Sequence, residues 1–172
     1  MKARFLLFLA GSLLLSPAVH AEEPPFTQVA RGEEPPFTGL VTGDRVHVRA
    51  GPGLSYEILF SLPKRARVRV VVREGDWYGV HLPEETRLYV HRSLVEVSEA
   101  EGRVTGDRVQ VRAGPGVTFS RTGLLRKGER VRVGGIEGDW VWIRPPESCR
   151  GWIRKDYVTF LEPAGNTAGG AS

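Results

Sequence analysis

Two nearly identical phrases hold the residues that could do chemistry in this chain of 172 residues. GDRVHVRAGPG occupies Gly43–Gly53, and GDRVQVRAGPG occupies Gly106–Gly116. A glycine-rich turn cradles phosphate when further glycines or a Gly-Lys-Ser/Thr step open a helix. Here the letters LSY follow the first turn, and no helical pattern follows them. The phrase therefore predicts a sharp chain reversal, because proline fixes φ and glycine permits positive φ.

The two phrases and their surroundings share no nucleophile and no histidine. His47 of the first copy becomes Gln110 in the second, and the one cysteine, Cys149, has no histidine at a recognisable spacing. We expect a structural or incidental role for this cysteine, with a nucleophile as the alternative. The shared acids lie beside glycine or proline, where solvated turn acids are common, with a catalytic carboxylate pair as the alternative. These acids are Asp44/Asp107, Glu74/Glu137, Asp76/Asp139 and Glu84/Glu147. We expect no enzyme activity, no metal site and no cofactor.

Tryptophans offer another kind of chemistry, a flat apolar platform with one hydrogen-bond donor. Trp77 and Trp140 occupy equivalent positions, and we expect them to pack across the neighbouring Gly-Pro-Gly turns, with ligand contact as the alternative. Trp142 differs, because its counterpart is Gly79 and the fold does not demand an aromatic residue there. Alternation places Trp142 on the outer face beside Arg144, which makes it the first candidate for a ligand contact.

Positive charge gathers in the second copy. Residues 102–160 carry a formal charge of +6, whereas residues 39–97 carry +2. Arg130 and Arg132 lie in a densely basic stretch, which is either a solvated face or an attractor for anionic envelope material. The whole chain carries only +4, which does not by itself indicate a nucleic-acid binder.

One arginine is shared just before each turn. We expect Arg49 and Arg112 to be structural and to pair with a turn acid such as Asp76 or Asp139. That pairing predicts non-additive losses in a double-mutant cycle of Arg49 and Asp76.

The elements that must position these residues are strands. Val46 and Val48 alternate with polar residues, and Val109 and Val111 repeat the pattern. A period of two is typical of strands with one dry face and one wet face. Short strands separated by glycine- and proline-rich turns predict a small all-β barrel or sandwich.

A repeat of 63 residues organises the chain. Shifting the sequence by 63 aligns residues 39–97 with residues 102–160 without a gap, with 27 identities over 59 positions. Only Ser98–Glu101 separates the copies, and four residues reach at most ~14 Å. The two copies must therefore lie side by side, and we expect each to close its own barrel.

The termini have their own patterns. Residues 1–21 have the basic start, apolar run and small-residue end of a secretory signal peptide, which predicts a periplasmic or extracellular protein without stable membrane insertion after cleavage. Residues 22–38 contain EEPPFT twice and predict an acidic, Pro-rich disordered segment. Residues 161–172 predict a flexible tail. Export disfavours nucleic acid as a partner.

Taken together, these motifs resemble bacterial SH3 (SH3b) domains. The resemblance rests on TGDRV, VRAGPG, RVRV and EGDW in both copies, and on RGWIRKDYV in the second, which holds Trp152 and Tyr157. The first copy departs from the pattern, with Leu88–Val90 in place of the Gly-Trp-Ile step and Leu94 in place of the tyrosine.

The resemblance implies an all-β fold of two tandem small SH3-like β-barrels, each with five to seven short strands. Such modules occur in exported bacterial proteins, and several are thought to bind peptidoglycan or its peptides. We expect an exported, non-enzymatic module that recognises peptidoglycan, mainly through the second copy. The alternatives are an envelope protein–protein scaffold and, third, an accessory subunit of a cell-wall hydrolase. The candidate ligand-binding residues are Trp142, Trp140, Arg144, Trp152, Tyr157, Arg130, Arg132 and Trp77.

Overall fold

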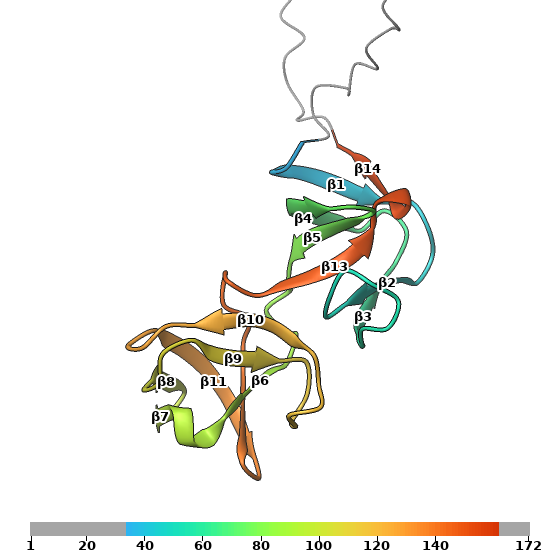
Figure 1. Cartoon of the computed structure of the whole chain (residues 1–172). Helices are drawn as coiled ribbons and strands as arrows, with labels where there is room; N and C mark the ends of the chain where they lie inside the picture. Colours follow the sequence, from blue (N-terminus) through green and yellow to red (C-terminus); the bar gives the residue numbers. More distant parts are fainter. Residues whose placement is uncertain (1–33, 162–172) are drawn as a thin grey trace, which may run out of the picture.

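A computed structural model describes residues 34–161, which form two small β-barrels (Figure 1). The expected signal peptide, the first EEPPFT and the tail beyond Leu161 lie outside the described residues. Within residues 34–161 the helices are two single 3₁₀ turns, η1 (Arg92–Leu94) and η2 (Lys155–Tyr157), and no helix is long and apolar enough to cross a membrane. The predicted all-β fold class is confirmed.

Barrel A is a seven-stranded antiparallel sheet with the order β14-β1-β4-β5-β13-β2-β3. Its strands are β1 (Phe37–Val41), β2 (Val46–Arg49), β3 (Ile58–Leu62), β4 (Arg67–Glu74), β5 (Trp77–His81), β13 (Arg150–Arg154) and β14 (Val158–Phe160). The alternating valines point inward as predicted, because Val48 and Val70 are fully buried.

Barrel B is a second seven-stranded antiparallel sheet with the order β10-β9-β6-β12-β11-β8-β7. Its strands are β6 (Leu88–His91), β7 (Val95–Ser98), β8 (Glu101–Val104), β9 (Val109–Arg112), β10 (Arg121–Leu125), β11 (Arg130–Glu137) and β12 (Trp140–Ile143). Val141 and Ile143 are fully buried, so the predicted inward face of β12 is confirmed.

The two repeats exchange their last strands. β13 and β14 come from the second repeat but complete barrel A, and β6 and β7 come from the first repeat but complete barrel B (Figure 1). β5 pairs with β13, which places Gly79 opposite Trp152, and β12 pairs with β6, which places Trp142 opposite Tyr89. Residues 39–97 and 102–160 are therefore repeats of the sequence, but neither range closes a barrel by itself, which corrects our expectation.

Duplication is the physical reason that this exchange is possible. Residues 63 positions apart occupy equivalent places, so β13 and β14 have in barrel A the positions that β6 and β7 have in barrel B. The chain crosses between the barrels at residues 82–87, which contain one proline, and at residues 144–149, which contain two. These prolines stiffen the backbone. Equivalent hydrogen bonds hold the crossings, from Thr86 N–H to Pro83 C=O at 3.0 Å and from Cys149 N–H to Pro146 C=O at 2.9 Å.

Barrel A also begins earlier than expected. Phe37 is 5% exposed, and its ring centroid lies 5.4 Å from that of Tyr78 and 5.7 Å from that of Phe160. The amide of Leu161 donates to the carbonyl of Thr38 at 2.9 Å. The last residues of the expected disordered segment 22–38 are therefore part of the barrel, because Phe37 supplies an aromatic ring that packs against the others.

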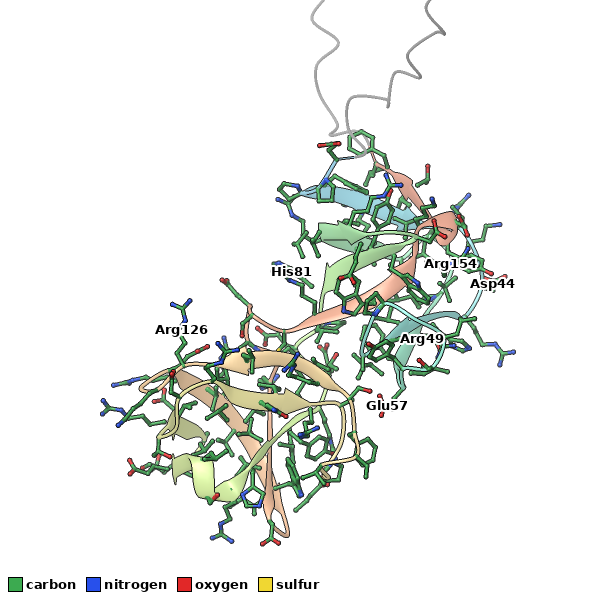
Figure 2. All side chains as sticks on the ribbon, in the orientation of Figure 1. Asp44, Arg49, Glu57, His81, Arg126 and Arg154 are labelled. Atoms are coloured by element: carbon green, nitrogen blue, oxygen red, sulfur yellow. The ribbon has the colours of Figure 1, made fainter. Side chains whose placement is uncertain are left out.

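The barrels meet across a pseudo-two-fold axis. The amide of Ser120 donates to a carboxylate oxygen of Glu57 at 3.1 Å, and these two residues are repeat equivalents. Figure 2 places Glu57 at the junction of the two barrels. A contact between equivalent residues is typical of an isologous interface, in which both residues lie on the axis.

Candidate ligand grooves

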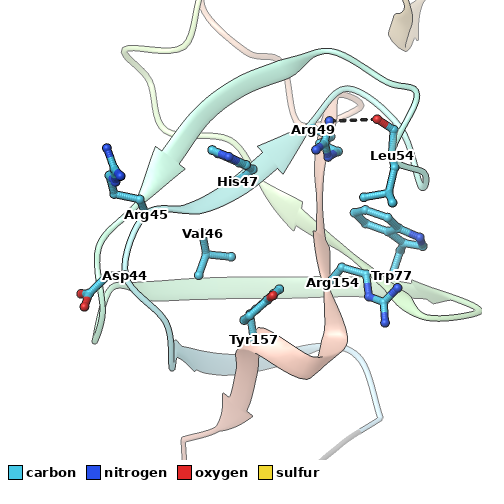
Figure 3. Close-up of a pocket in the computed structure, with 9 residues that line it drawn as sticks. All are labelled: Asp44, Arg45, Val46, His47, Arg49, Leu54, Trp77, Arg154 and Tyr157. Carbon is cyan, nitrogen blue, oxygen red and sulfur yellow. Dashed lines mark hydrogen bonds between the residues drawn. The ribbon is translucent and has the colours of Figure 1, made fainter.

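Groove A is a hollow of about 330 Å³ on barrel A (Figure 3). Half-buried Trp77, at the start of β5, forms one wall together with the exposed side chain of Leu54. Tyr157 of η2 faces them from the second repeat. The groove is lined by Asp44, Arg45, Val46, His47, Arg49, Leu54, Trp77, Arg154 and Tyr157.

Groove B is a hollow of about 380 Å³ on barrel B. It is lined by Asp107, Arg108, Val109, Gln110, Arg112, Val117, Trp140, His91 and Leu94. Every one of these residues is the repeat equivalent of a residue in groove A. Each groove therefore takes most of its lining from one repeat and its 3₁₀ corner from the other, which is a direct consequence of the strand exchange.

The repeated phrase both shapes the grooves and lines them. A Cβ atom added to Gly51 would collide with the ring of Tyr56, and one added to Gly114 would collide with the ring of Phe119. The first glycine of each turn therefore packs directly on an aromatic ring, which leaves no room for a side chain at that position. The rings nearest to Gly51 and Gly114 are those of Tyr56 and Phe119, while Trp77 and Trp140 line the grooves beside the turns.

The shared arginines hold the loops that form the groove walls. Nη1 of Arg49 donates to the carbonyls of Leu54 and Tyr56 at 3.1 and 2.8 Å. Nη1 of Arg112 makes the equivalent bonds to Val117 and Phe119 at 2.9 and 2.8 Å. The expected structural role is therefore supported by the contacts in both barrels.

The expected partner of Arg49 was wrong, however. The carboxylate of Asp76 lies 2.7 Å from Nζ of Lys155, which comes from the exchanged segment of the second repeat. This hydrogen-bonded ion pair lowers the pKa of Asp76. The guanidinium of Arg49 donates to carbonyl oxygens instead, because the loop after β2 folds back over its side chain. The spacing of residues in the sequence does not reveal this geometry.

The grooves differ in the residues that surround their tryptophans. In groove B the ring of His91 meets Trp140 edge to face, with centroids 5.4 Å apart, and Nδ1 of His91 lies 2.8 Å from the hydroxyl of Ser93. In groove A the equivalent residue is Arg154, whose guanidinium forms an ion pair with Asp156. Groove A therefore has a permanent cation at the position where groove B has an imidazole.

Trp142 lies outside both grooves. Its indole covers Gly134 and Gly135 on the neighbouring strand β11, where any added Cβ would collide with the ring. The guanidinium of Arg87 lies 4.7 Å from the ring centroid, on a residue from the other repeat. The alternating pattern correctly predicted that Trp142 lies on the outer face of the strand. Its indole is nevertheless covered, because it packs on the backbone of two glycines and under the guanidinium of Arg87.

The basic candidates also lie away from the grooves. Arg132 and Arg144 contact the same carboxylate of Glu84 at 3.4 and 3.6 Å, and Arg130 lies 3.5 Å from Glu101. These side chains are substantially exposed and partly neutralised. Exposed pairs of this kind contribute about 0–1 kcal/mol each to stability.

Two further residues have clear positions. Trp152 is half-buried and lines a hollow between the barrels. Cys149 is 2% exposed in the core of barrel B, and burial raises its pKa to about 11, which suits the structural role we expected. Within residues 34–161, no group of three or more His, Cys, Asp or Glu side chains is placed to hold a metal ion.

Sequence reasoning missed several groove residues. Asp44, Arg45, His47, Leu54 and Arg154 were not among the candidates, although all five line groove A. The repeated phrase was the signal that could have found most of them, since Asp44, Arg45 and His47 lie within it, but it was interpreted only as a strand between two turns.

Comparison with known proteins adds the family. The sequence model of the family "Bacterial SH3 domain" matches residues 44–96 and 107–159, which together make up more than half of the chain. A Bacillus subtilis (strain 168) protein named "Putative N-acetylmuramoyl-L-alanine amidase YrvJ" is 28% identical over 130 residues, which cover 69% of this chain. The chain spans only 25% of that relative's length. With its fold, its two motifs and this match, the chain belongs to the bacterial SH3 domain family, of which it contains two tandem copies.

Proposed function

We propose that this chain is an exported, non-enzymatic module that binds peptidoglycan through grooves A and B. The observation that carries the proposal is that the two hollows are lined at the same nine repeat positions. Each combines a tryptophan, aliphatic side chains and guanidinium groups. A peptide segment with apolar and carboxylate groups matches this chemistry.

The linings support binding rather than catalysis. His47 of groove A lies 2.9 Å from the hydroxyl of Ser61, but Gln110 replaces the histidine in groove B. The ionisable residues common to both grooves are one aspartate and two arginines, and one of those arginines is held by loop carbonyls. The residues common to both grooves therefore do not include a nucleophile beside a general base.

Two grooves on one folded chain favour a polymeric ligand. The strand exchange ties the barrels together, so the second groove is held at a high effective concentration once the first has bound. A repetitive wall polymer would exploit this avidity, whereas a single small ligand would not.

An envelope protein is the second candidate partner. Leu54 is 72% exposed and Val117 is 73% exposed, at equivalent positions on the groove rims. Exposed aliphatic residues beside a groove suit a protein segment as well as a wall peptide. Association with a cell-wall amidase is third, because it rests on the name of a relative that this chain covers only in part.

Co-sedimentation with purified, protein-free insoluble peptidoglycan tests the proposal. We expect Trp77→Ala and Trp140→Ala each to weaken binding about tenfold or more, and the double variant to lose it, since buried aromatic anchors dominate binding energy. Ile136→Ala is the matched control, because this residue is 47% exposed and lies outside both grooves. Wild-type binding by the folded double variant would refute the proposal, and no sedimentation of the wild-type chain would favour the protein partner.

A further inference from the structure

The strand exchange creates a second pair of hollows, which lie between the barrels. Cleft 1 has a volume of about 530 Å³ and cleft 2 about 490 Å³. Cleft 1 is lined by Ile58, Leu59, Phe60, Pro83, Glu85, Thr86, Arg87, Tyr89 and Ala113. Cleft 2 is lined by Ala50, Gly51, Pro52, Tyr56, Glu74, Arg121, Thr122, Gly123, Leu124, Ser148, Arg150 and Trp152. Most of the cleft 1 positions recur in cleft 2 as repeat equivalents, as the pseudo-two-fold axis requires.

The two clefts have diverged in charge. Arg121 of cleft 2 replaces Ile58 of cleft 1, which changes an aliphatic wall into a cationic one. The arginine common to both is engaged in cleft 1, where Arg87 lies 3.5 Å from Glu137 and 4.7 Å from the ring centroid of Trp142. In cleft 2 neither Arg121 nor Arg150 takes part in an ion pair with any residue of the described range 34–161.

The remaining lining of cleft 2 has both apolar and polar character. Half-buried Trp152 presents an indole, and Ser148 and Glu74 add a hydroxyl and a carboxylate. Two exposed guanidiniums favour a carboxylate, which they can bind through paired N–H donors. Glu74 can accept from peptide N–H groups and repels a dense polyanion, so a peptide with one or two carboxylates matches better than a phosphate polymer.

We propose that cleft 2 binds an acidic peptide, with a carboxylate between Arg121 and Arg150 and the neighbouring peptide segment against Trp152. This site is separate from grooves A and B and does not depend on them. It exists only because the exchange brings β10 of one barrel beside β13 of the other.

Nuclear magnetic resonance of the full chain tests this site. The chain has four tryptophans, so four indole N–H signals are expected, and single Trp→Phe variants assign them. The probe is the peptide acetyl-Ala-Glu-Glu-amide. We expect it to shift the Trp152 signal saturably, and we expect Arg121→Ile to remove that shift without altering any response of the Trp77 and Trp140 signals.

Matched probes and variants sharpen the test. Acetyl-Ala-Gln-Gln-amide should bind at least about tenfold more weakly, because the charge-assisted hydrogen bonds are lost. Arg121→Ile, which installs the residue of cleft 1, and Arg150→Gln should weaken the acidic peptide about as much. Arg126→Ile is the control, because Arg126 lies on the outer edge of barrel B (Figure 2).

Several outcomes would overturn this assignment. They are an unmoved Trp152 signal, equal binding of the two peptides, or full binding by Arg121→Ile. Tighter binding of poly(glycerol phosphate) than of the acidic peptide would instead make the site one for phosphate polymers and would also overturn it. Because Arg121→Ile leaves both grooves intact, its co-sedimentation with peptidoglycan should not change, so this proposal and the proposed function can fail separately.

Discussion

Grooves A and B are largely alike on one side and differ on the other. Each repeated phrase and the strands after it supply five residues of the same type to the two grooves. These are one aspartate, two arginines, one valine and one tryptophan. Both residues supplied by the exchanged segment differ, because Arg154 and Tyr157 of groove A correspond to His91 and Leu94 of groove B. The side supplied within each repeat is therefore largely constant, with differences at His47/Gln110 and Leu54/Val117, whereas the exchanged side differs at both of its positions.

The outer faces of β5 and β12 give the largest expected effect. In barrel A small Gly79 faces bulky Val72, and in barrel B bulky Trp142 faces small Gly135. We expect Trp142→Gly to cost about 3 kcal/mol or more of unfolding free energy, and an added Gly135→Val to recover part of that loss. Urea denaturation measures both. A loss below about 0.5 kcal/mol would show that this indole does not stabilise the barrel.

The next largest effect is expected from the two arginines that hold the groove loops, and the loss of unfolding free energy should be similar in the two barrels. Arg49→Ala and Arg112→Ala each remove two hydrogen bonds to carbonyls, so we expect losses of about 1–3 kcal/mol in unfolding free energy. In a double-mutant cycle Arg49→Ala and Asp76→Ala should be additive, because the two side chains have different partners. Strong coupling between the two substitutions would contradict these contacts and support the Arg49–Asp76 pairing expected from the sequence.

The residues at the 3₁₀ turn, which each groove receives from the other repeat, should set the difference in peptidoglycan affinity between grooves A and B. In a Trp140→Ala background, where groove A acts alone, we expect Tyr157→Leu to weaken peptidoglycan binding several-fold, since it removes an aromatic ring that is 47% exposed. In a Trp77→Ala background Leu94→Tyr should strengthen binding through groove B. Co-sedimentation measures both, and unchanged affinities in the two backgrounds would contradict a role for these residues.

The smallest effect concerns an ion pair of barrel A. The pKa of Asp76 is lowered by Lys155, so the folded state favours the charged carboxylate. Its small contribution to stability should be present above the ordinary Asp pKa and should vanish as the pH falls through the lowered value. Asp76→Asn should therefore lower the urea midpoint slightly at neutral pH and leave it unchanged in acid. Asp139→Asn in barrel B, which removes no ion pair within the described residues, should leave the midpoint unchanged at both pH values.

Much of the fold was readable because its signals are local. The valines around His47 and Gln110 alternate with a period of two, which identified strands and a dry face. The exchange was not readable, because the alternating pattern of a closing strand identifies its buried face and not the barrel that it completes. A degenerate pattern cannot indicate which copy of a strand completes which barrel.

The site was partly readable for a related reason. Trp77, Trp140 and Tyr157 were candidates and do line the grooves. Trp142 was misjudged because its packing depends on Gly134 and Gly135, which lie on a neighbouring strand. Periodicity within one strand identifies a face, but only cross-strand contacts show what covers that face.

The strand exchange itself is the claim on which both grooves and both clefts depend, and engineered disulfides test it most directly. His81 is the strand partner of Arg150, whereas a self-closed first repeat would pair it with Arg87, the repeat equivalent. In a Cys149→Ser background, we expect cysteines at positions 81 and 150 to form a disulfide in the monomer, identified by peptide mass mapping after gel filtration. Cysteines at 81 and 87 should remain free. Efficient bonding between 81 and 87, with none between 81 and 150, would contradict the exchange.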